Sequence, residues 1–150
     1  MKKTIIKRIA ALAVVMSCIV GMATVANASM PVYEEEVGFT ATGSEYSSKQ
    51  YKTEYSDYYT VKIASYTFTS NPTVWPSGKY IETTLTSTAG TVIGARIYNY
   101  SYNYSSTSRG SYNSTWKSIT GSKVMVRVST NTGKSGTITL RWSPGSYASL

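Results

Sequence analysis

Four tyrosines stand at every second position of the segment YNYSYNY, namely Tyr98, Tyr100, Tyr102 and Tyr104. In an extended strand this spacing places all four side chains on one face of a sheet. Phenol rings combine a flat apolar surface with a hydroxyl tip that forms hydrogen bonds, and they lose little entropy on binding. The row therefore predicts an aromatic platform. Sugars and glycan polymers, whose C–H faces lie against aromatic rings, are the ligands that suit it.

Two more residues extend this candidate binding site. Arg96 shares the parity of the row and could contact an anion or a hydroxyl group of a ligand. Trp75 lies in the Pro-bracketed segment PTVWPSG, where an indole in a loop could contact a ligand or a membrane. Two other interpretations of the row stay open, because strand tyrosines also form cross-strand packing pairs and exposed strands also self-associate.

Residue types that perform catalysis are scarce in this chain. It has no histidine, and its single cysteine is Cys18. Residues 29–150 therefore contain no Ser-His or Cys-His nucleophilic pair and no imidazole or thiolate metal site. No spacing selects an acid–base pair from the seven carboxylates, which are Glu34, Glu35, Glu36, Glu45, Glu54, Asp57 and Glu82. We expect no catalytic residue, no metal and no cofactor.

Two short segments resemble ligand-binding motifs only in part. The acidic run at 34–36 is consecutive and lacks the alternating ligands of a calcium loop. The segment GKSG at 133–136 lacks the upstream glycine of a phosphate-binding loop and has short strands on both sides. We expect the second segment to form a hairpin turn, since Asn131 and Gly133 tolerate a positive φ.

The elements that would position the tyrosine row are short strands separated by turn residues. Apolar and polar residues alternate within them, as in Ile138, Leu140 and Trp142, and this alternation predicts strands with one buried face. In 58–69 the alternation changes phase, which predicts a bulge near Ala64 and Ser65. The seven expected strands are 37–42, 58–69, 79–87, 91–104, 112–120, 123–129 and 137–143.

Strands with one apolar face each predict an all-β domain, a single antiparallel β-sandwich over residues 37–150. A small closed β-barrel is the alternative. The abundance of Ser, Thr and Tyr after residue 29 agrees with strands, and little in the chain favours helices. We expect residues 29–36 to form a flexible acidic leader, and the polar segment 43–57 has no predicted structure.

The N-terminus predicts export from the cell. Basic residues at positions 2, 3, 7 and 8 precede an apolar run that ends in Ala26-Asn27-Ala28, so residues 1–28 read as a cleaved signal peptide. A membrane anchor is one alternative, and a lipoprotein attached at Cys18 is another. Four of the 15 basic residues lie in this segment, which leaves 11 basic and 7 acidic residues, a net charge of +4. No disulfide can form within residues 29–150.

These patterns together predict a secreted, extracellular, non-catalytic binding domain, with a Gram-positive bacterium as the expected source. Its expected partner is a glycan-like extracellular or cell-wall polymer, contacted through the tyrosine face. A positively charged domain could also approach an anionic membrane surface, whereas scattered basic residues do not predict nucleic-acid binding. The alternatives are a secreted membrane-active toxin of bacteriocin type and a self-assembling surface or matrix protein.

Overall fold

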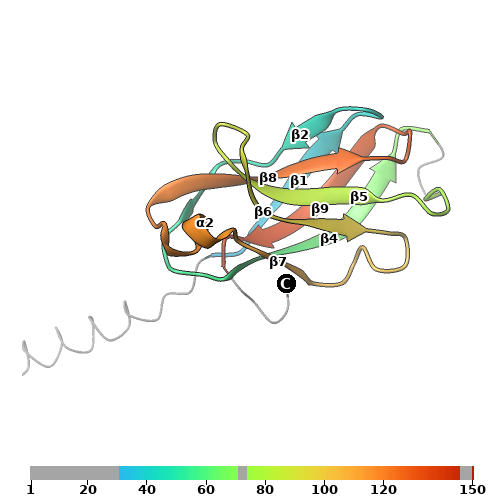
Figure 1. Ribbon diagram of the computed structural model, residues 1–150. Coiled ribbons are helices and arrows are strands. Elements are labelled where there is room, and N and C mark those ends of the chain that lie inside the picture. The colour runs from blue at the N-terminus through green and yellow to red at the C-terminus, as the bar shows by residue number, and fades with distance from the viewer. Residues whose placement is uncertain (1–30, 71–73, 146–149) are drawn as a thin grey trace, which may run out of the picture.

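Two antiparallel sheets face each other in the computed structural model, which describes residues 31–70, 74–145 and 150 (Figure 1). The first sheet has the order β1-β9-β4-β7 and the second the order β2-β8-β5-β6, with β3 also paired to β8. The predicted β-sandwich is confirmed, and the sheets do not close into a barrel. The strands are β1 (Tyr33–Phe39), β2 (Ser44–Tyr46), β3 (Gln50–Lys52), β4 (Tyr58–Phe68), β5 (Ile81–Ser87), β6 (Val92–Asn99), β7 (Ser108–Ser111), β8 (Ser122–Thr130) and β9 (Gly136–Ser143).

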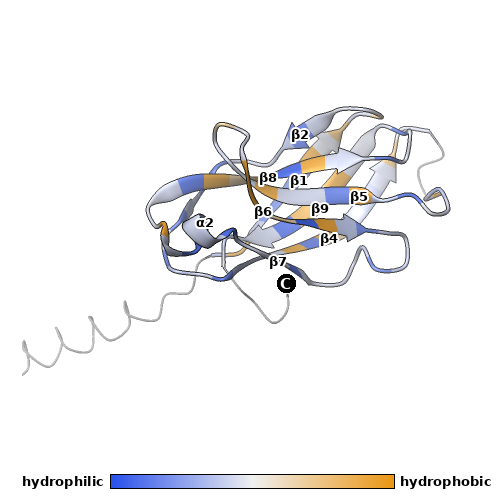
Figure 2. Cartoon of the chain, viewed as in Figure 1, coloured by the Kyte–Doolittle hydropathy of each residue, from blue (hydrophilic) through white to orange (hydrophobic). Residues whose placement is uncertain are grey.

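The core lies between the sheets and consists of the alternating apolar side chains. Figure 2 shows apolar bands interrupted by polar ones along the strands. Burial removes each such side chain from water and stabilises the fold by about 1.5–3 kcal/mol apiece. The predicted inward-facing sets of β4, β8 and β9 are confirmed as buried: Tyr59, Val61 and Ile63; Val124, Val126 and Val128; Ile138, Leu140 and Trp142.

The predicted irregularity in β4 is also confirmed. The pairing of β4 with β9 shifts register between Ile63 and Ser65. One extra residue reverses which parity faces the core, so Phe68 is buried after the shift, as Ile63 is before it. The predicted hairpin turn at Gly133 is confirmed as well, because Gly133 adopts a φ of 69°. Gly90, between β5 and β6, also has a positive φ, of 81°.

Strand β1 begins earlier than the sequence pattern indicated, because residues 33–36 of the expected leader pair with β9. The acidic side chains of this segment have partners. Glu35 accepts hydrogen bonds from Trp142 Nε1 at 2.8 Å and from the Ser48 amide at 2.7 Å. Glu34 forms an ion pair with Arg141 at 3.0 Å. The predicted signal peptide, Cys18 and the Asn71-Pro72 turn lie outside the described residues.

The expectation of a strand at 112–120 is wrong. Helix α2 (Ser114–Ser118) occupies this region, and the Asn113 side chain accepts a hydrogen bond from the Trp116 amide at 3.0 Å. Such a cap satisfies a helical donor and competes with strand pairing. The preceding residues 108–111, expected in a loop, form β7, while the unassigned segment 43–57 contains β2 and β3. None of the helices in the described ranges is long and apolar enough to cross a membrane.

A tyrosine links the two sheets at the edge where β6 and β7 meet. Tyr59 of β4 is fully buried, and its hydroxyl donates across the core to Ala95 O at 2.6 Å. Its ring lies against Gly94 and Gly110, where no side chain fits. A Cβ on Gly94 would stand 2.8 Å from Tyr59 Cε1, and one on Gly110 would overlap the same atom. Because these two glycines have no side chain, the backbone of β6 and β7 can lie directly against the Tyr59 ring.

Tyr112 and Lys52 complete this buried edge. The Tyr112 ring meets Tyr59 edge-on at 6.3 Å, and its hydroxyl donates to Pro144 O at 2.8 Å. Lys52 Nζ lies 5.0 Å from the Tyr112 ring centroid. The Lys52 side chain is fully buried, and its ammonium group donates to the carbonyls of Glu54, Lys117 and Ile119 at 2.7, 2.9 and 2.8 Å. Lys52 therefore joins β3 to the end of α2.

Replacing Gly110 by alanine should destabilise the domain, because the new Cβ overlaps the Tyr59 ring. The surrounding core is closely packed, so the ring can move aside only with strain. We expect the free energy of unfolding in urea to fall by about 1–3 kcal/mol. Gly38→Ala is the matched control, since a Cβ there meets only Gly136 O at 4.0 Å. Equal stability of the two variants would contradict this account of the glycine.

Stability should fall at alkaline pH. Burial raises the pKa of Tyr59 and of Tyr112 above the ordinary value of 10.0. Above pH 10 the unfolded chain therefore loses protons that the folded chain keeps, and the free energy of unfolding falls by up to about 1.4 kcal/mol per pH unit for each tyrosine. Burial lowers the pKa of Lys52 from 10.5, so its opposite contribution ends once the pH exceeds 10.5.

The measurement is urea unfolding between pH 10.5 and 12 for the natural chain and for Tyr112→Phe. The variant lacks one of the two phenols with a raised pKa. The part of the decline in unfolding free energy that Tyr59 and Tyr112 cause should therefore be about half as steep per pH unit in the variant. An identical slope in both proteins would show that Tyr112 does not stay protonated in the folded state.

Candidate binding site

The four alternating tyrosines do not form one row. Strand β6 ends at Asn99, and only Tyr98 of the four stands on it. The Asn103 side chain accepts a hydrogen bond from the Tyr100 amide at 2.7 Å, and the Tyr104 amide donates to Tyr100 O at 2.9 Å. The chain turns at this point because an asparagine side chain captures a backbone donor. The prediction of a strand that continues to residue 104 is wrong.

A different set of tyrosines forms a continuous surface, here called the tyrosine strip: Tyr80, Tyr98, Tyr100 and Tyr102. The rings of Tyr100 and Tyr102 stack at 5.4 Å with an interplanar angle of 5°. Tyr80 meets Tyr100 edge-on at 5.8 Å and Tyr98 edge-on at 4.8 Å. Tyr102 is 82% exposed and Tyr98 is 41% exposed. The strip therefore presents ring surface to solvent along its length.

Tyr80 was missed as a site residue, because it lies in the expected strand 79–87 and outside the alternating tyrosines of 98–104. Cross-strand pairing brings it to the strip, since Ile81 stands opposite Asn99 and Glu82 opposite Tyr98. Its backbone is anchored by the turn after β8. The Tyr80 amide donates to Asn131 Oδ1 at 2.7 Å, and Tyr80 O accepts from Thr130 Oγ1 at 3.1 Å.

A hollow of about 460 Å³ lies at the end of the strip, between the turn at 76–79 and the turn at 100–102. Gly78 makes the first turn possible, because its φ is 68°. The hollow combines aromatic rings, hydroxyl groups and one ammonium group. Its lining residues are Ser77, Gly78, Lys79, Tyr100, Ser101 and Tyr102.

Two of the predicted contact residues pack beneath this region. Trp75 is only 9% exposed, and its indole Nε1 donates to Lys79 O at 2.9 Å. Tyr104 stacks on Trp75 at 5.6 Å, and Tyr66 meets both rings edge-on at 4.8 and 5.1 Å. The expected role of Trp75 as a loop contact does not agree with this burial. Trp75 and Tyr104 instead hold the 76–79 turn on the core.

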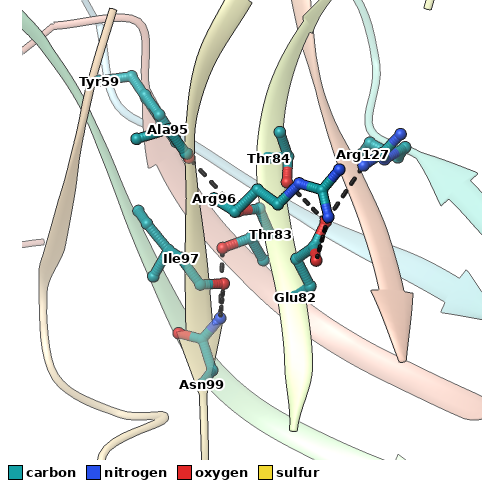
Figure 3. Close-up of polar contacts among 9 residues, drawn as sticks. All are labelled: Tyr59, Glu82, Thr83, Thr84, Ala95, Arg96, Ile97, Asn99 and Arg127. Carbon is teal, nitrogen blue, oxygen red and sulfur yellow. Dashed lines mark hydrogen bonds and ion pairs between the residues drawn. The ribbon is translucent and has the colours of Figure 1, made fainter. Parts of the chain in front are cut away.

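Arg96 belongs to a group of charged side chains on the outer face of the second sheet. Glu82 on the central strand β5 lies between Arg96 Nη1 at 3.6 Å and Arg127 Nη2 at 3.1 Å (Figure 3). Thr84 Oγ1 also donates to the Glu82 carboxylate, at 3.0 Å. Two guanidinium groups thus share one carboxylate, and Arg96 is 55% exposed beside Tyr98. This end of the strip keeps an excess positive charge.

Buried polar contacts fix the strand that bears Tyr98. Asn99 Nδ2 donates to Ile81 O at 3.0 Å. It also donates to Thr83 Oγ1 at 3.2 Å (Figure 3). The Asn99 side chain is buried, and a satisfied amide in the core holds β6 at one position along β5. The strip consequently stands on a rigid base.

In the described part of the chain, no three or more His, Cys, Asp or Glu side chains gather as metal ligands. Glu82 forms ion pairs with Arg96 and Arg127 and accepts a hydrogen bond from Thr84. The strip and the hollow present phenol rings, hydroxyl groups and basic residues. Comparison with known proteins finds no matching family model, no matching curated protein and no matching solved structure.

Mutation of Tyr104 should destabilise the domain much more than mutation of Tyr102. Tyr104→Ser removes the ring contacts with Trp75 and Tyr66. Each contact stabilises the fold by about 0.5–1.5 kcal/mol, so the melting temperature should fall by several degrees. Tyr102→Ser removes a ring that is 82% exposed and stacks on Tyr100, so the free energy of unfolding should fall by only about 0.5 kcal/mol, the lower end of the range for an aromatic pair. Differential scanning calorimetry of both variants measures this. Equal destabilisation would mean that the two rings have the same role.

Proposed function

We propose that the protein is a secreted, non-catalytic binding protein that contacts a glycan-like extracellular or cell-surface polymer through the tyrosine strip. The observation that supports this most is the continuous ring surface of Tyr98, Tyr80, Tyr100 and Tyr102 beside a hydroxyl-lined hollow. Export, as predicted from residues 1–28, is part of the same proposal. It would bring the domain to polymers outside the cell.

The geometry of the stacked pair suits a sugar ring. The rings of Tyr100 and Tyr102 are nearly parallel, so each ring covers one face of the other. The exposed Tyr102 side chain still has ring surface free for the apolar face of a sugar. Ser77 and Ser101 line the same hollow and supply hydroxyl groups for hydrogen bonds to a polyol. A site with few precisely placed polar groups on an aromatic floor is typical of ligand binding.

The proposal is tested by co-sedimentation of the chain from residue 29 onward with insoluble cell-wall glycan and with anionic liposomes, each in low and in high salt. We expect pelleting with glycan that persists in high salt, because ring stacking is screened far less than charge attraction. Pelleting with liposomes alone would favour a membrane-active protein. Light scattering that rises with protein concentration would favour self-assembly.

The tyrosine strip itself is tested by the double variant Tyr100→Ser/Tyr102→Ser, which should lose glycan binding. The matched control is Tyr51→Ser/Tyr55→Ser, which removes two exposed phenols elsewhere on the surface, 51% and 62% exposed. The control should pellet with glycan like the natural chain. Circular dichroism confirms that both variants are folded, and equal binding by the two would overturn the assignment of the strip.

A further inference from the structure

We propose that the hollow beside the tyrosine strip selects polymers with anionic substituents, carboxylate or phosphate, and that Lys79 is the contact for the charge. This inference rests on the proposed function and names the class of ligand that the same site takes. It depends on three features of the site. Among the described residues no carboxylate pairs with Lys79, the other end of the strip is also positively charged, and the tyrosine rings lie between the two.

Lys79 is an exposed lysine held in place through its backbone. Its amide donates to Pro76 O at 3.2 Å, and its carbonyl accepts the Trp75 indole proton at 2.9 Å. Among the described residues no carboxylate lies within ion-pair distance of its ammonium group, and none of the described residues that line the hollow is acidic. The charge of Lys79 is therefore available to a ligand in the hollow.

The opposite end of the strip has the same sign. Arg96 and Arg127 share the single carboxylate of Glu82, so one positive charge stays uncompensated next to Tyr98. Arg96 is the more exposed of the two arginines. A polymer lying along the rings would meet a cation at each end. Repeating anionic groups along a sugar chain would satisfy both cations, whereas a neutral chain would satisfy neither.

The two kinds of contact predict different salt dependence. An exposed ammonium–carboxylate contact weakens as salt screens it, while ring contact with a sugar persists. An anionic polymer should therefore bind more tightly than its neutral counterpart in low salt, and the two should converge in high salt. The lysine ammonium is a point charge without the fork geometry of arginine. Lys79 can therefore pair with either a carboxylate or a phosphate group.

The experiment compares polygalacturonate with its methyl ester, which has the same sugar backbone without the charge. Polyglycerol phosphate is a third probe that separates phosphate from carboxylate as the source of the anion. Affinities are measured by titration calorimetry in low and high salt for the natural chain, Lys79→Gln, Lys49→Gln and Tyr102→Ser. Lys49 is an exposed lysine before β3, which pairs with the far end of β8, and its variant makes the same charge change away from the strip.

We expect Lys79→Gln to weaken binding of polygalacturonate about fivefold in low salt and to leave the methyl ester unaffected. Lys49→Gln should bind both polymers like the natural chain. Tyr102→Ser should weaken both. Tighter binding of only one of the two anionic probes than of the methyl ester would identify the substituent.

Equal losses in Lys79→Gln and Lys49→Gln, or affinity of the natural chain for both anionic polymers no higher than for the methyl ester, would overturn the inference while the proposed function stands. Failure of the natural chain to bind any of the three polymers or the wall glycan would overturn the proposed function itself. Circular dichroism of each variant confirms that a loss of affinity is not a loss of fold.

Discussion

The hydrogen bond from Tyr59 to Ala95 O joins the two sheets through the core. Tyr59 projects from β4 across the core, and Gly94 and Gly110 leave room for its ring. A buried hydroxyl needs a partner, and here the partner is the backbone of the edge strand β6 in the other sheet. This contact, together with the bridge between Gly94 and Tyr112, fixes the position of β6 relative to the first sheet.

The tyrosine strip stands on that edge and gains its rigidity from buried polar groups. Asn99 fixes β6 to β5, Glu82 joins three strands through two arginines, and Asn131 anchors the backbone of Tyr80. Each of these groups would destabilise the fold if it were buried without its partner. Paired, they hold exposed rings at definite positions, and a preorganised surface binds with less loss of entropy.

The division of aromatic residues between core and surface follows from the turn after β6. Asn103 turns the chain, and Tyr104 then points to Trp75 and Tyr66 while Tyr102 stays in solvent. Two tyrosines only two positions apart thus have different environments. Trp75 is also absorbed into the core, where it supports the turn of the hollow through Lys79 O. Exposed rings and a ring packed on the core thus occur within one short segment.

Local patterns of the sequence were sufficient for the strands with a buried face. The alternation in β4, β8 and β9, the bulge near Ala64 and the turn at Gly133 follow from side-chain period and glycine chemistry alone. The same reasoning failed at 112–120, where the Asn113 cap favours a helix, and at 100–104, where Asn103 ends the strand. Asparagine side chains decide such points through single hydrogen bonds, which a periodicity does not contain.

Of the candidate site, the sequence by itself determined that four tyrosines and Arg96 stand at every second position of one segment, and it left open whether their side chains are exposed or packed. The tertiary structure alone decided which phenols touch. The pairing of β5 with β6 shifts register between Thr84 and Thr86, and this shift, together with the buried Asn99, sets Tyr80 beside Tyr98 and Tyr100. A register is a relation between two segments, fixed by the contacts of both, and no single stretch of residues specifies it.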